Sequence, residues 1–369
     1  MNETREVEQN SVVLRLRKAV LDADMKSHTI LTDDVFSYVD FYFKAHKKII
    51  KDANGKKVEQ NHHFYWEQSR NFFKAAKVLP IESAPLPMYY CMLNAVKAYL
   101  LYGSKNYDEV KNAFRCHGLQ EAGGTSELAR KDLDNIFVKR KNQGVFCEFA
   151  KKIDSSFDLL WPINKGKTSL KELINQVPFV HAAYVSTYSV RRKDEKFLPI
   201  KSNESPTFRY DKGNEIRLFV NLDRNYFKKD AVSIPDEVKR NIPDQLIVSE
   251  DDGFQLKSKE GFRKSDIPNI CNKYRKLFSY ISANQRLWYL KKNKMSENEI
   301  GNINSMILEI AIVHRFSEIV RYKPEQMIKL MNGKENWLIH EFLSLVLNQF
   351  MDEIACEITK QEIMPTRTK

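Results

Sequence analysis

The stretch YYCMLNAVKAYLLYG, Tyr89–Gly103, predicts a helix that is apolar almost all the way round. Two polar residues, Asn94 and Lys97, lie on adjoining turns of this helix. Burying an unpaired ammonium is costly, so Lys97 must reach solvent, pair with an acid or lose its proton. In one interpretation the lysine extends to the surface while Asn94 hydrogen-bonds a neighbouring loop. In the other, both side chains line a cavity that binds an anion.

A second segment carries polar groups that would complete such a cavity. The sequence FRCHGL places Arg115 and His117 just before a glycine-rich loop. Arginine presents a planar fork that suits phosphate, and histidine transfers protons near neutral pH. His117 is therefore a candidate acid–base residue with Arg115 beside it, unless the histidine only hydrogen-bonds the start of the loop.

A late predicted helix, near 304–321, carries His314, Ser317 and Arg321 on one face. A Ser–His nucleophile is not supported, because no GxSxG elbow surrounds the serine. The alternative is a polar seam between packed helices. We hypothesise that this face meets the Tyr89–Gly103 helix and completes one pocket. The predicted anion pocket then comprises Asn94, Lys97, Arg115, His117, Arg321 and Lys323.

The bulk properties favour a cytoplasmic protein that meets polyanions. Of 369 residues, 42% are hydrophobic and 11% aromatic, which is enough for a packed core. The net charge of +12 favours partners such as RNA or DNA. Five scattered cysteines without a CxxC pair indicate reduced thiols. We recognise no signal peptide and no uncharged apolar run of roughly 18 residues, so no membrane partner is expected.

Hydrophobic periodicity predicts a mainly α fold of the α+β class, a helical bundle with a small antiparallel β insertion. Residues 1–60 are expected to form an N-terminal helical extension, with the amphipathic stretches SVVLRLRKAVLDAD and DDVFSYVDFYFKAHKKII. Residues 61–175 form a helical region, and 265–369 a C-terminal helical region that completes the bundle. Between them, 176–264 contain β structure, because PTFRYDKGNEIRLFVNL alternates on both sides of a turn.

The segment 273–294, KYRKLFSYISANQRLWYLKKNK, is a candidate nucleic-acid-binding site. It has seven basic residues and no acidic one, interleaved with aromatic residues. Basic side chains contact phosphates and aromatic rings stack on bases. The alternative is an amphipathic helix whose aromatic side chains belong to the core. If nucleic acid binds here, we expect contacts from Arg275, Lys276, Arg286 and Lys291.

The sequence lacks the motifs of common metal and nucleotide sites. It has no P-loop, no GxGxxG and no HExxH. His62 and His63 are adjacent, but no further ligand stands at metal-binding spacing. We therefore expect no metal and no cofactor.

Several segments, taken in order, resemble the YaaC-like family of bacterial proteins. They are the run from Trp66 through SRNFFKAAK, then PMYYCMLNAVKAYLLYG, then CHGL, and finally LEIAIVHRFSEIVRYKPEQM. The last segment has a serine followed by Arg-Tyr-x-Pro, which that family shows near the chain end. The resemblance covers about 61–360 and implies no particular reaction, since the family has no well-established activity.

The run YYCMLNAVKAYLL followed by HGL is also similar to the second helix of HEPN-type domains. This resemblance implies an antiparallel helical bundle and a setting in toxin–antitoxin or antiviral modules. Many HEPN domains are metal-independent RNases with an Arg-x4-6-His motif, in which arginine stabilises charge on the phosphate and histidine transfers a proton. None of the eight histidines here follows an arginine at that spacing, and Arg115 lies too close to His117.

We therefore expect a YaaC-like, HEPN-like binding protein and not an ordinary HEPN nuclease. The expected partner is RNA or DNA, or a protein encoded by a neighbouring gene in a stress or antiviral module, and self-association stays open. One alternative is a divergent metal-independent RNase, with His117 as acid–base and Arg115, Lys97 or Arg321 holding phosphate. The other is a purely structural subunit of a larger complex.

Overall fold

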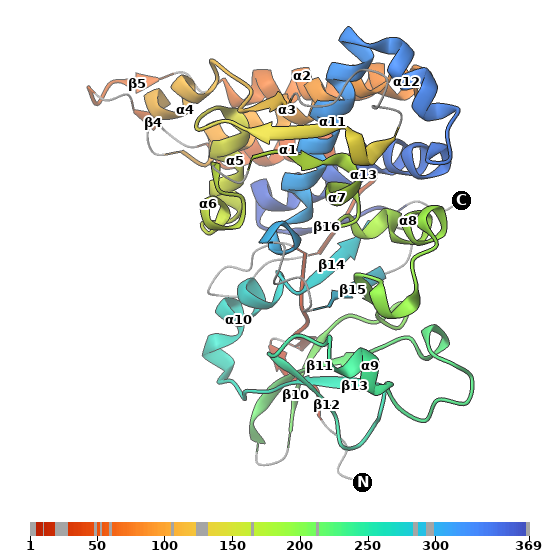
Figure 1. The fold of residues 1–369 in the computed structure, drawn as a ribbon. Coiled ribbons are helices and arrows are strands. Elements are labelled where there is room, and N and C mark those ends of the chain that lie inside the picture. The colour runs from red at the N-terminus through yellow and green to blue at the C-terminus, as the bar shows by residue number, and fades with distance from the viewer. Residues whose placement is uncertain are drawn as a thin grey trace. The chain divides into compact units, whose positions relative to one another are not determined.

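Helices and several small sheets make this a protein of mixed α and β structure (Figure 1). The computed structural model describes residues 5–9, 11–18, 29–47, 50–51, 54–58, 61–104, 107–122, 132–163, 166–211, 214–282, 287–292 and 299–366. Contacts divide the chain into two compact units. The β unit contains 1–31, 190–298 and 360–369, and the helical unit contains 32–189 and 299–359.

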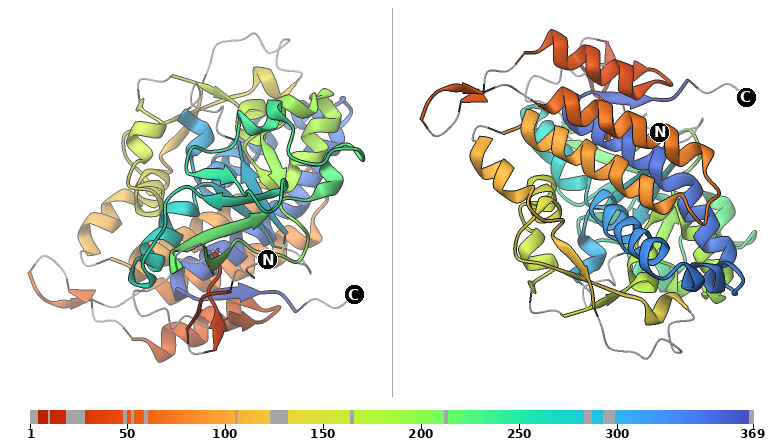
Figure 2. Two further views of the ribbon diagram at one scale, coloured as in Figure 1. Left: turned by 90° about the horizontal axis from the view of Figure 1, so that it is seen from below. Right: turned by 90° about the horizontal axis from the view of Figure 1, so that it is seen from above.

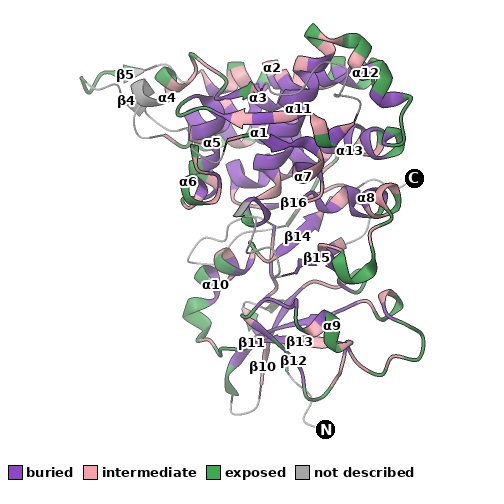
Figure 3. Cartoon of the chain, viewed as in Figure 1, coloured by how far each residue is buried: buried purple, intermediate pink, exposed green. Residues whose placement is uncertain are grey.

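Helix α3 (Pro85–Tyr102) lies at the centre of the helical unit and confirms the helix predicted from its apolar sequence. Pro85 suits the first turn, where a backbone N–H would have no helical partner. Gly103 caps the other end. The helices packed against α3 include α2 (His62–Val78), α5 (Val145–Ile153), α11 (Ser305–Tyr322) and α13 (Asn336–Thr359). This surrounding explains why α3 and α11 are buried over most of their length (Figure 3).

Shorter elements complete the helical unit. The helices are α1 (Val35–Ala45), α4 (Tyr107–Ala113), α6 (Phe157–Leu160), α7 (Leu170–Ile174), α8 (His181–Tyr188) and α12 (Pro324–Met331). An antiparallel sheet in the order β6-β7-β8 contains β6 (Leu119–Glu121), β7 (Phe137–Arg140) and β8 (Thr168–Ser169), and a hairpin pairs β4 (Ile50–Lys51) with β5 (Lys57–Val58). Helices α2 and α3 lie side by side in the right-hand view of Figure 2, as expected from the short turn that joins them.

The β unit is built on two antiparallel sheets. The first, in the order β10-β11-β13-β12, contains β10 (Thr207–Tyr210), β11 (Ile216–Asn221), β12 (Leu246–Val248) and β13 (Gln255–Ser258). The second, in the order β14-β15-β9, contains β9 (Phe197–Pro199), β14 (Phe278–Ile281) and β15 (Leu287–Lys291). The other elements are β1 (Glu8–Gln9), β2 (Val12–Val13), β3 (Thr29–Leu31), β16 (Glu362–Met364), α9 (Asp236–Lys239) and α10 (Ile267–Tyr274).

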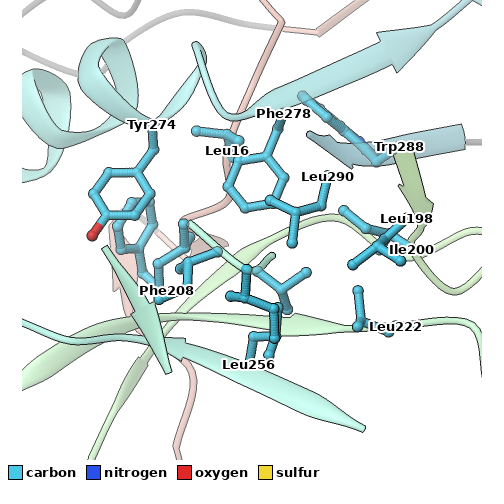
Figure 4. Close-up of a cluster of buried hydrophobic side chains, with 14 of the residues drawn as sticks. Leu16, Leu198, Ile200, Phe208, Leu222, Leu256, Tyr274, Phe278, Trp288 and Leu290 are labelled. Atoms are coloured by element: carbon cyan, nitrogen blue, oxygen red, sulfur yellow. The ribbon is translucent and has the colours of Figure 1, made fainter. Parts of the chain in front are cut away.

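The two sheets and α10 share one apolar core, shown in Figure 4. Alternate residues of a strand point to the same face, so Leu218 and Val220 of β11 both enter this core. Phe208 from β10 and Leu256 from β13 join them. The pairing of β10 with β11 confirms the hairpin predicted in the middle of the chain, although 212–213 of its turn lie outside the described residues.

The first 60 residues differ from the predicted helical extension. Among the described residues of this region, those in helical conformation belong to the second amphipathic stretch, as α1, where the Asp34 carboxylate accepts a hydrogen bond from Ser37 N at 3.0 Å. The first stretch forms part of the β1–β2 hairpin and continues as extended chain. Its apolar residues, such as Leu14 and Leu16, are buried at alternate positions, which is the period of a strand. Residues 19–28 lie outside the described part of the chain.

The bounds of the β unit differ from the predicted insertion of 176–264 at both ends, because the corresponding part of this unit covers 190–298. The region from 265 onward was expected to be helical throughout. Instead, the aromatic and β-branched residues of β14 and β15 form a hairpin after the short helix α10. Within the described part of the chain, every helix is too short or too polar to cross a bilayer. All five cysteines are free, as their spacing predicted.

Candidate anion-binding site

A cavity of about 310 Å³ lies in the helical unit, between α3, α11 and the segment that joins α4 to β6. Helix α3 contributes Tyr89 and Tyr90 to its wall, and α11 contributes His314, Glu318 and Arg321. These α11 residues are spaced at i, i+4 and i+7, so they share one face of the helix. Because both helices are packed into the interior of the unit, the wall they form is firmly held.

The segment after α4 brings Arg115 and His117 to the same cavity. The first two amides of α5 hold this segment by donating to the backbone carbonyls of Cys116 at 3.1 Å and His117 at 3.0 Å. Such amides have no partner inside their own helix, so they seek acceptors elsewhere. The chain passes so closely that a Cβ at Gly144 would lie 2.5 Å from the Gly118 nitrogen. The glycines therefore permit the close approach that positions His117.

Three aromatic side chains from different segments meet in the cavity. The Tyr89 hydroxyl lies 2.6 Å from Nδ1 of His117, and the two rings stack with centroids 5.3 Å apart. Tyr89 also meets His314 edge to face at 4.9 Å, and the two imidazole centroids are 5.8 Å apart. Among the described residues, Nε2 of His117 has no hydrogen-bond partner, so this nitrogen is available to a ligand.

A buried ionic network adjoins these rings. Arg315, which is 1% exposed, contacts Glu121 at 2.9 Å and Glu318 at 3.2 Å. Lys323 contacts the same Glu121 at 3.0 Å. His314 Nδ1 lies 3.7 Å from Glu318, which is too far for a hydrogen bond, and it has no other partner among the described residues. His314, which lines the cavity, thus has a buried ring nitrogen that no hydrogen bond in the described part of the chain satisfies.

The surroundings shift the pKa values of these groups in ways that leave them uncharged at neutral pH. Burial lowers the pKa of His314 to about 3, and the nearby His117 and Arg315 add to this. Burial also lowers the pKa of His117, followed by the positive charges of Lys97, Lys141 and Arg321. Burial raises the pKa of Tyr89 well above its usual range.

The pKa of Glu318 is raised, chiefly by burial, although Arg315 opposes the shift. A carboxyl group with a raised pKa holds its proton more readily than an exposed one. Together with two neutral imidazoles, this arrangement provides groups that can accept and donate protons close to one another.

Three cations at the cavity have no acidic partner. Arg115, Lys141 and Arg321 line it, and none of them forms an ion pair with any carboxylate in the described part of the chain. The two acidic side chains nearby are already bound to Arg315 or Lys323. An anion that enters the cavity therefore meets uncompensated positive charge.

The structure unites three residues of the predicted pocket, namely Arg115, His117 and Arg321. Asn94 does not line the cavity, because its Nδ2 donates to the Tyr90 carbonyl of its own helix at 2.7 Å. Lys323 is held outside the cavity by Glu121.

Lys97 also lies outside the wall of the cavity, and its environment answers the question raised by its sequence. Its Nζ is 5.3 Å from the centre of the Tyr65 ring and 5.4 Å from that of Phe114. A cation over aromatic faces gains electrostatic stabilisation without an acid. Partial burial lowers the pKa of Lys97. This lysine is therefore half-buried against aromatic rings, does not line the cavity, and acts on His117 only through its charge.

The segment predicted to bind nucleic acid, 273–294, contributes aromatic residues to the core of the β unit. Its rings Tyr274, Phe278, Tyr280 and Trp288 are buried in the core, where they cannot stack on bases. Lys291, at the end of β15, is buried as well.

Of the other basic side chains proposed there, Lys276 is exposed and Arg275 is half-buried at the end of α10. Arg286 lies outside the described residues. Hydrophobic burial thus outweighs base stacking as the explanation of this aromatic pattern.

Two further sequence hypotheses can be compared with the geometry. The Ser317 hydroxyl donates to the His314 backbone carbonyl at 2.6 Å, so it is not activated by the imidazole. His62 is buried between aromatic rings, and in the described residues no three or more His, Cys, Asp or Glu side chains are grouped so that they could hold a metal.

Sequence reasoning missed Tyr89, Lys141 and Glu318. It placed the helix face that carries His314 at the pocket, but it left His314 out of the set of pocket residues. The i, i+4, i+7 spacing of His314, Glu318 and Arg321 was a signal for the α11 face. Tyr89 had no such signal, because a phenol in an apolar helix looks like any other core aromatic residue.

Comparison with known proteins identifies a family. The searches of curated proteins and of solved structures found no match. A family model described as YaaC-like Protein matches residues 32–358, which nearly coincides with the limits of the helical unit at 32 and 359. The match starts well before residue 61, so α1 belongs to the shared part and not to an added extension. Because this model matches most of the chain, the protein belongs to the YaaC-like family.

Proposed function

We propose that this protein binds the phosphate backbone of a nucleic acid in the cavity of the helical unit. The observation that carries the proposal is the convergence of Arg115, Lys141 and Arg321, none with an acidic partner among the described residues, around two imidazoles. Phosphate takes charge-assisted hydrogen bonds from guanidinium and ammonium groups. The net charge of +12 favours encounter with such a ligand.

The wider setting follows from the resemblance noted above. The side-by-side packing of α2 and α3 suits a HEPN-like bundle, and we keep that likeness as part of the proposal. A role in a stress or antiviral module, with a protein partner encoded nearby, stays a prediction of that resemblance.

Binding is tested with a fluorescein-labelled 12-nucleotide RNA and the full-length protein by fluorescence anisotropy at several salt concentrations. Arg321→Glu and Arg115→Glu should each weaken binding by about tenfold or more and flatten the dependence on salt. Lys276→Glu in the β unit is the matched control, since it makes the same charge change at an exposed site, and should leave affinity nearly unchanged. Equal loss in all three variants would contradict a localised site.

A second function, metal-independent RNA cleavage, is favoured by one specific observation. His117 and His314 flank Tyr89 with their centroids 5.8 Å apart, beside a carboxyl group whose pKa is raised. Binding alone would not need such proton-transfer groups. This candidate is the divergent RNase expected as an alternative, with the second imidazole supplied by α11 instead of an Arg-x4-6-His motif.

The chemistry follows from the positions of these groups. In this proposal Nε2 of His117 takes the proton of a ribose 2′-hydroxyl, whose oxygen attacks phosphorus and forms a 2′,3′-cyclic phosphate. The bond to the 5′-oxygen breaks, that oxygen takes a proton from water, and the proton held by His117 neutralises the hydroxide so formed. Arg115 and Arg321 stabilise the charge that develops on the phosphate oxygens. Tyr89 orients His117 through its Nδ1.

Cleavage is tested by incubating a labelled RNA with the full-length protein in EDTA. The expected product ends in a 2′,3′-cyclic phosphate, and His117→Ala should reduce the rate by about 100-fold or more. A DNA of the same sequence should bind but remain intact, because it lacks the 2′-hydroxyl. Absence of product with intact binding would leave the protein as a binding protein only.

A further inference from the structure

The cavity does not end at the imidazoles. A second, more open groove of about 650 Å³ adjoins it, and the two share Cys116 and Lys141 in their walls. The groove follows strand β7 and the turn after it, and both depressions belong to the helical unit. A ligand held at the imidazoles can therefore continue into the groove without leaving this unit.

Strand β7 and the residue after it supply three basic side chains to the groove, Lys139, Arg140 and Lys141. Arg140 is buried and paired with Asp158 at 2.7 Å, whereas Lys139 is half-buried and Lys141, two residues further along, is exposed. Residues two apart on a strand are separated by about 6.5 Å, a distance comparable with the spacing of successive phosphates in an extended strand. Neither lysine has an ion-pair partner among the described residues.

The opposite face of the same hairpin carries the acid. Gln120 of β6 pairs with Lys139 of β7, so both lie on the groove side. Glu121 pairs with Val138, whose face is buried, and there it contacts Arg315. Strand alternation thus turns the carboxylate away from the groove and turns an amide toward it. Removing the acid from the groove leaves its positive charge uncompensated.

We propose that the ligand is a single-stranded RNA that runs from the cavity along β7, with Lys139 and Lys141 contacting phosphates next to the one held near His117. This inference rests on the proposed function and specifies its substrate class. The amide side chains of Gln120, Asn142 and Gln143 in the groove can hydrogen-bond the Watson–Crick edges of bases, which are free only in unpaired RNA. At the cavity, Tyr322 is 65% exposed and offers a face for base stacking.

The test compares two probes and two variants of the full-length protein. The probes are uridine 3′-monophosphate, which fits the cavity alone, and a labelled 12-nucleotide oligouridine. Lys139→Glu should weaken binding of the 12-mer about 5- to 10-fold and reduce the salt slope by about 1, while binding of the mononucleotide stays unchanged. Arg321→Glu should weaken both. Lys74→Glu, on the exposed side of α2, is the matched control and should weaken neither.

The outcomes separate the two proposals. If Arg321→Glu weakens the 12-mer and Lys139→Glu does not, the groove assignment is wrong while the cavity remains the binding site. If neither probe binds the unaltered protein, the proposed function fails as well. Equal affinity for a 12-base-pair duplex overturns the single-strand assignment, and equally strong competition by polyglutamate points to an acidic protein instead. Lys139→Gln, with an unchanged melting temperature, checks that loss of charge and not misfolding causes the effect.

Discussion

The β unit and the helical unit differ in which kinds of side chain they bury: aromatic rings of a basic segment in the first, and charged or polar side chains of a helix in the second. In the β unit, the segment richest in lysine, arginine and aromatic residues buries its rings Phe278 and Trp288 in an apolar core. In the helical unit, the most buried part of α11 contains His314 and Arg315, which are 5% and 1% exposed. The segment that resembles a nucleic-acid site is thus a core hairpin, while a helix that resembles core material forms the wall of a polar cavity.

The difference shows that a polar residue points to a functional site when it is buried despite the cost of its desolvation. Aromatic side chains inside a β hairpin lower the free energy simply by leaving water. Arg315 and His314 gain nothing comparable from burial, so specific partners must compensate for their desolvation. Arg315 has two carboxylates, whereas Nδ1 of His314 is buried and has no hydrogen-bond partner among the described residues.

The largest stability effect should come from the ionic network of the helical unit. Arg315→Met leaves Glu318 in a half-buried position without its cation, and should lower the free energy of unfolding by about 3–5 kcal/mol. Urea denaturation measures this change. Arg321→Met is the control, because Arg321 lies on the same helix but is exposed. This substitution should change stability by no more than about 0.5 kcal/mol. Similar losses in both variants would show that α11 is not held by this network.

The matched prediction for the β unit is a loss of stability without a loss of binding. Leu256→Ala should lower the free energy of unfolding by about 2–5 kcal/mol, because Leu256 is fully buried and its truncation leaves a cavity in the core. Binding of RNA to the folded protein should not change. Val232→Ala, at a side chain 90% exposed, is the control for stability. If fully folded Leu256→Ala lost RNA affinity, the β unit would also take part in RNA binding.

Acid should destabilise the helical unit through His314. Its pKa is about 3 in the folded state and about 6.5 in the unfolded chain, so the unfolded chain binds more protons between these values. The free energy of unfolding therefore falls as the pH drops below about 6.5, by about 3 kcal/mol at pH 4. The raised pKa of Glu318 acts in the opposite direction and offsets part of the loss.

Denaturation of His314→Gln at pH 7 and pH 4 isolates this contribution. The variant should lose most of the slope between these pH values, because glutamine does not titrate. His340→Gln, at an exposed position of α13, is the matched control and should keep the slope. An unchanged slope in His314→Gln would mean that other groups cause the acid sensitivity.

A smaller effect is expected at the Tyr89 hydroxyl. Tyr89→Phe removes its 2.6 Å contact with His117 and should lower the free energy of unfolding by about 1 kcal/mol. If His117 takes part in RNA cleavage, the rate should fall more than RNA affinity does, because the tyrosine only orients the imidazole. Parallel loss of rate and affinity would assign Tyr89 to ligand binding.

The smallest effect should be at the segment first favoured for nucleic acid. Lys276→Glu changes an exposed side chain beyond α10 and should alter stability by no more than about 0.5 kcal/mol. Its RNA affinity should stay within about twofold of the unaltered protein. A tenfold loss of RNA affinity would place the nucleic-acid site in the β unit instead of the helical unit.

The sequence pattern predicted the helices and strands that bury one clear face or that are apolar all the way round. The apolar run of α3 and the hairpin of β10 with β11 were both predicted, because each depends on neighbours in sequence. The strand character of 11–18 and of β15 was missed, since short amphipathic runs fit a period of two or of 3.6 nearly as well. Only long-range pairing, such as β15 with β9, decides between them.

The sequence by itself determined that α3 is buried, that the chain is basic and that Arg115 and His117 lie on one short segment. It also named Arg321 as a partner of theirs. Tertiary structure alone decided that Tyr89 and Glu318 line the cavity, that Lys97 is held by aromatic rings, and that Glu121 turns away from the groove. The physical reason is that solvation depends on which distant groups surround a side chain, and no spacing along the chain specifies those groups.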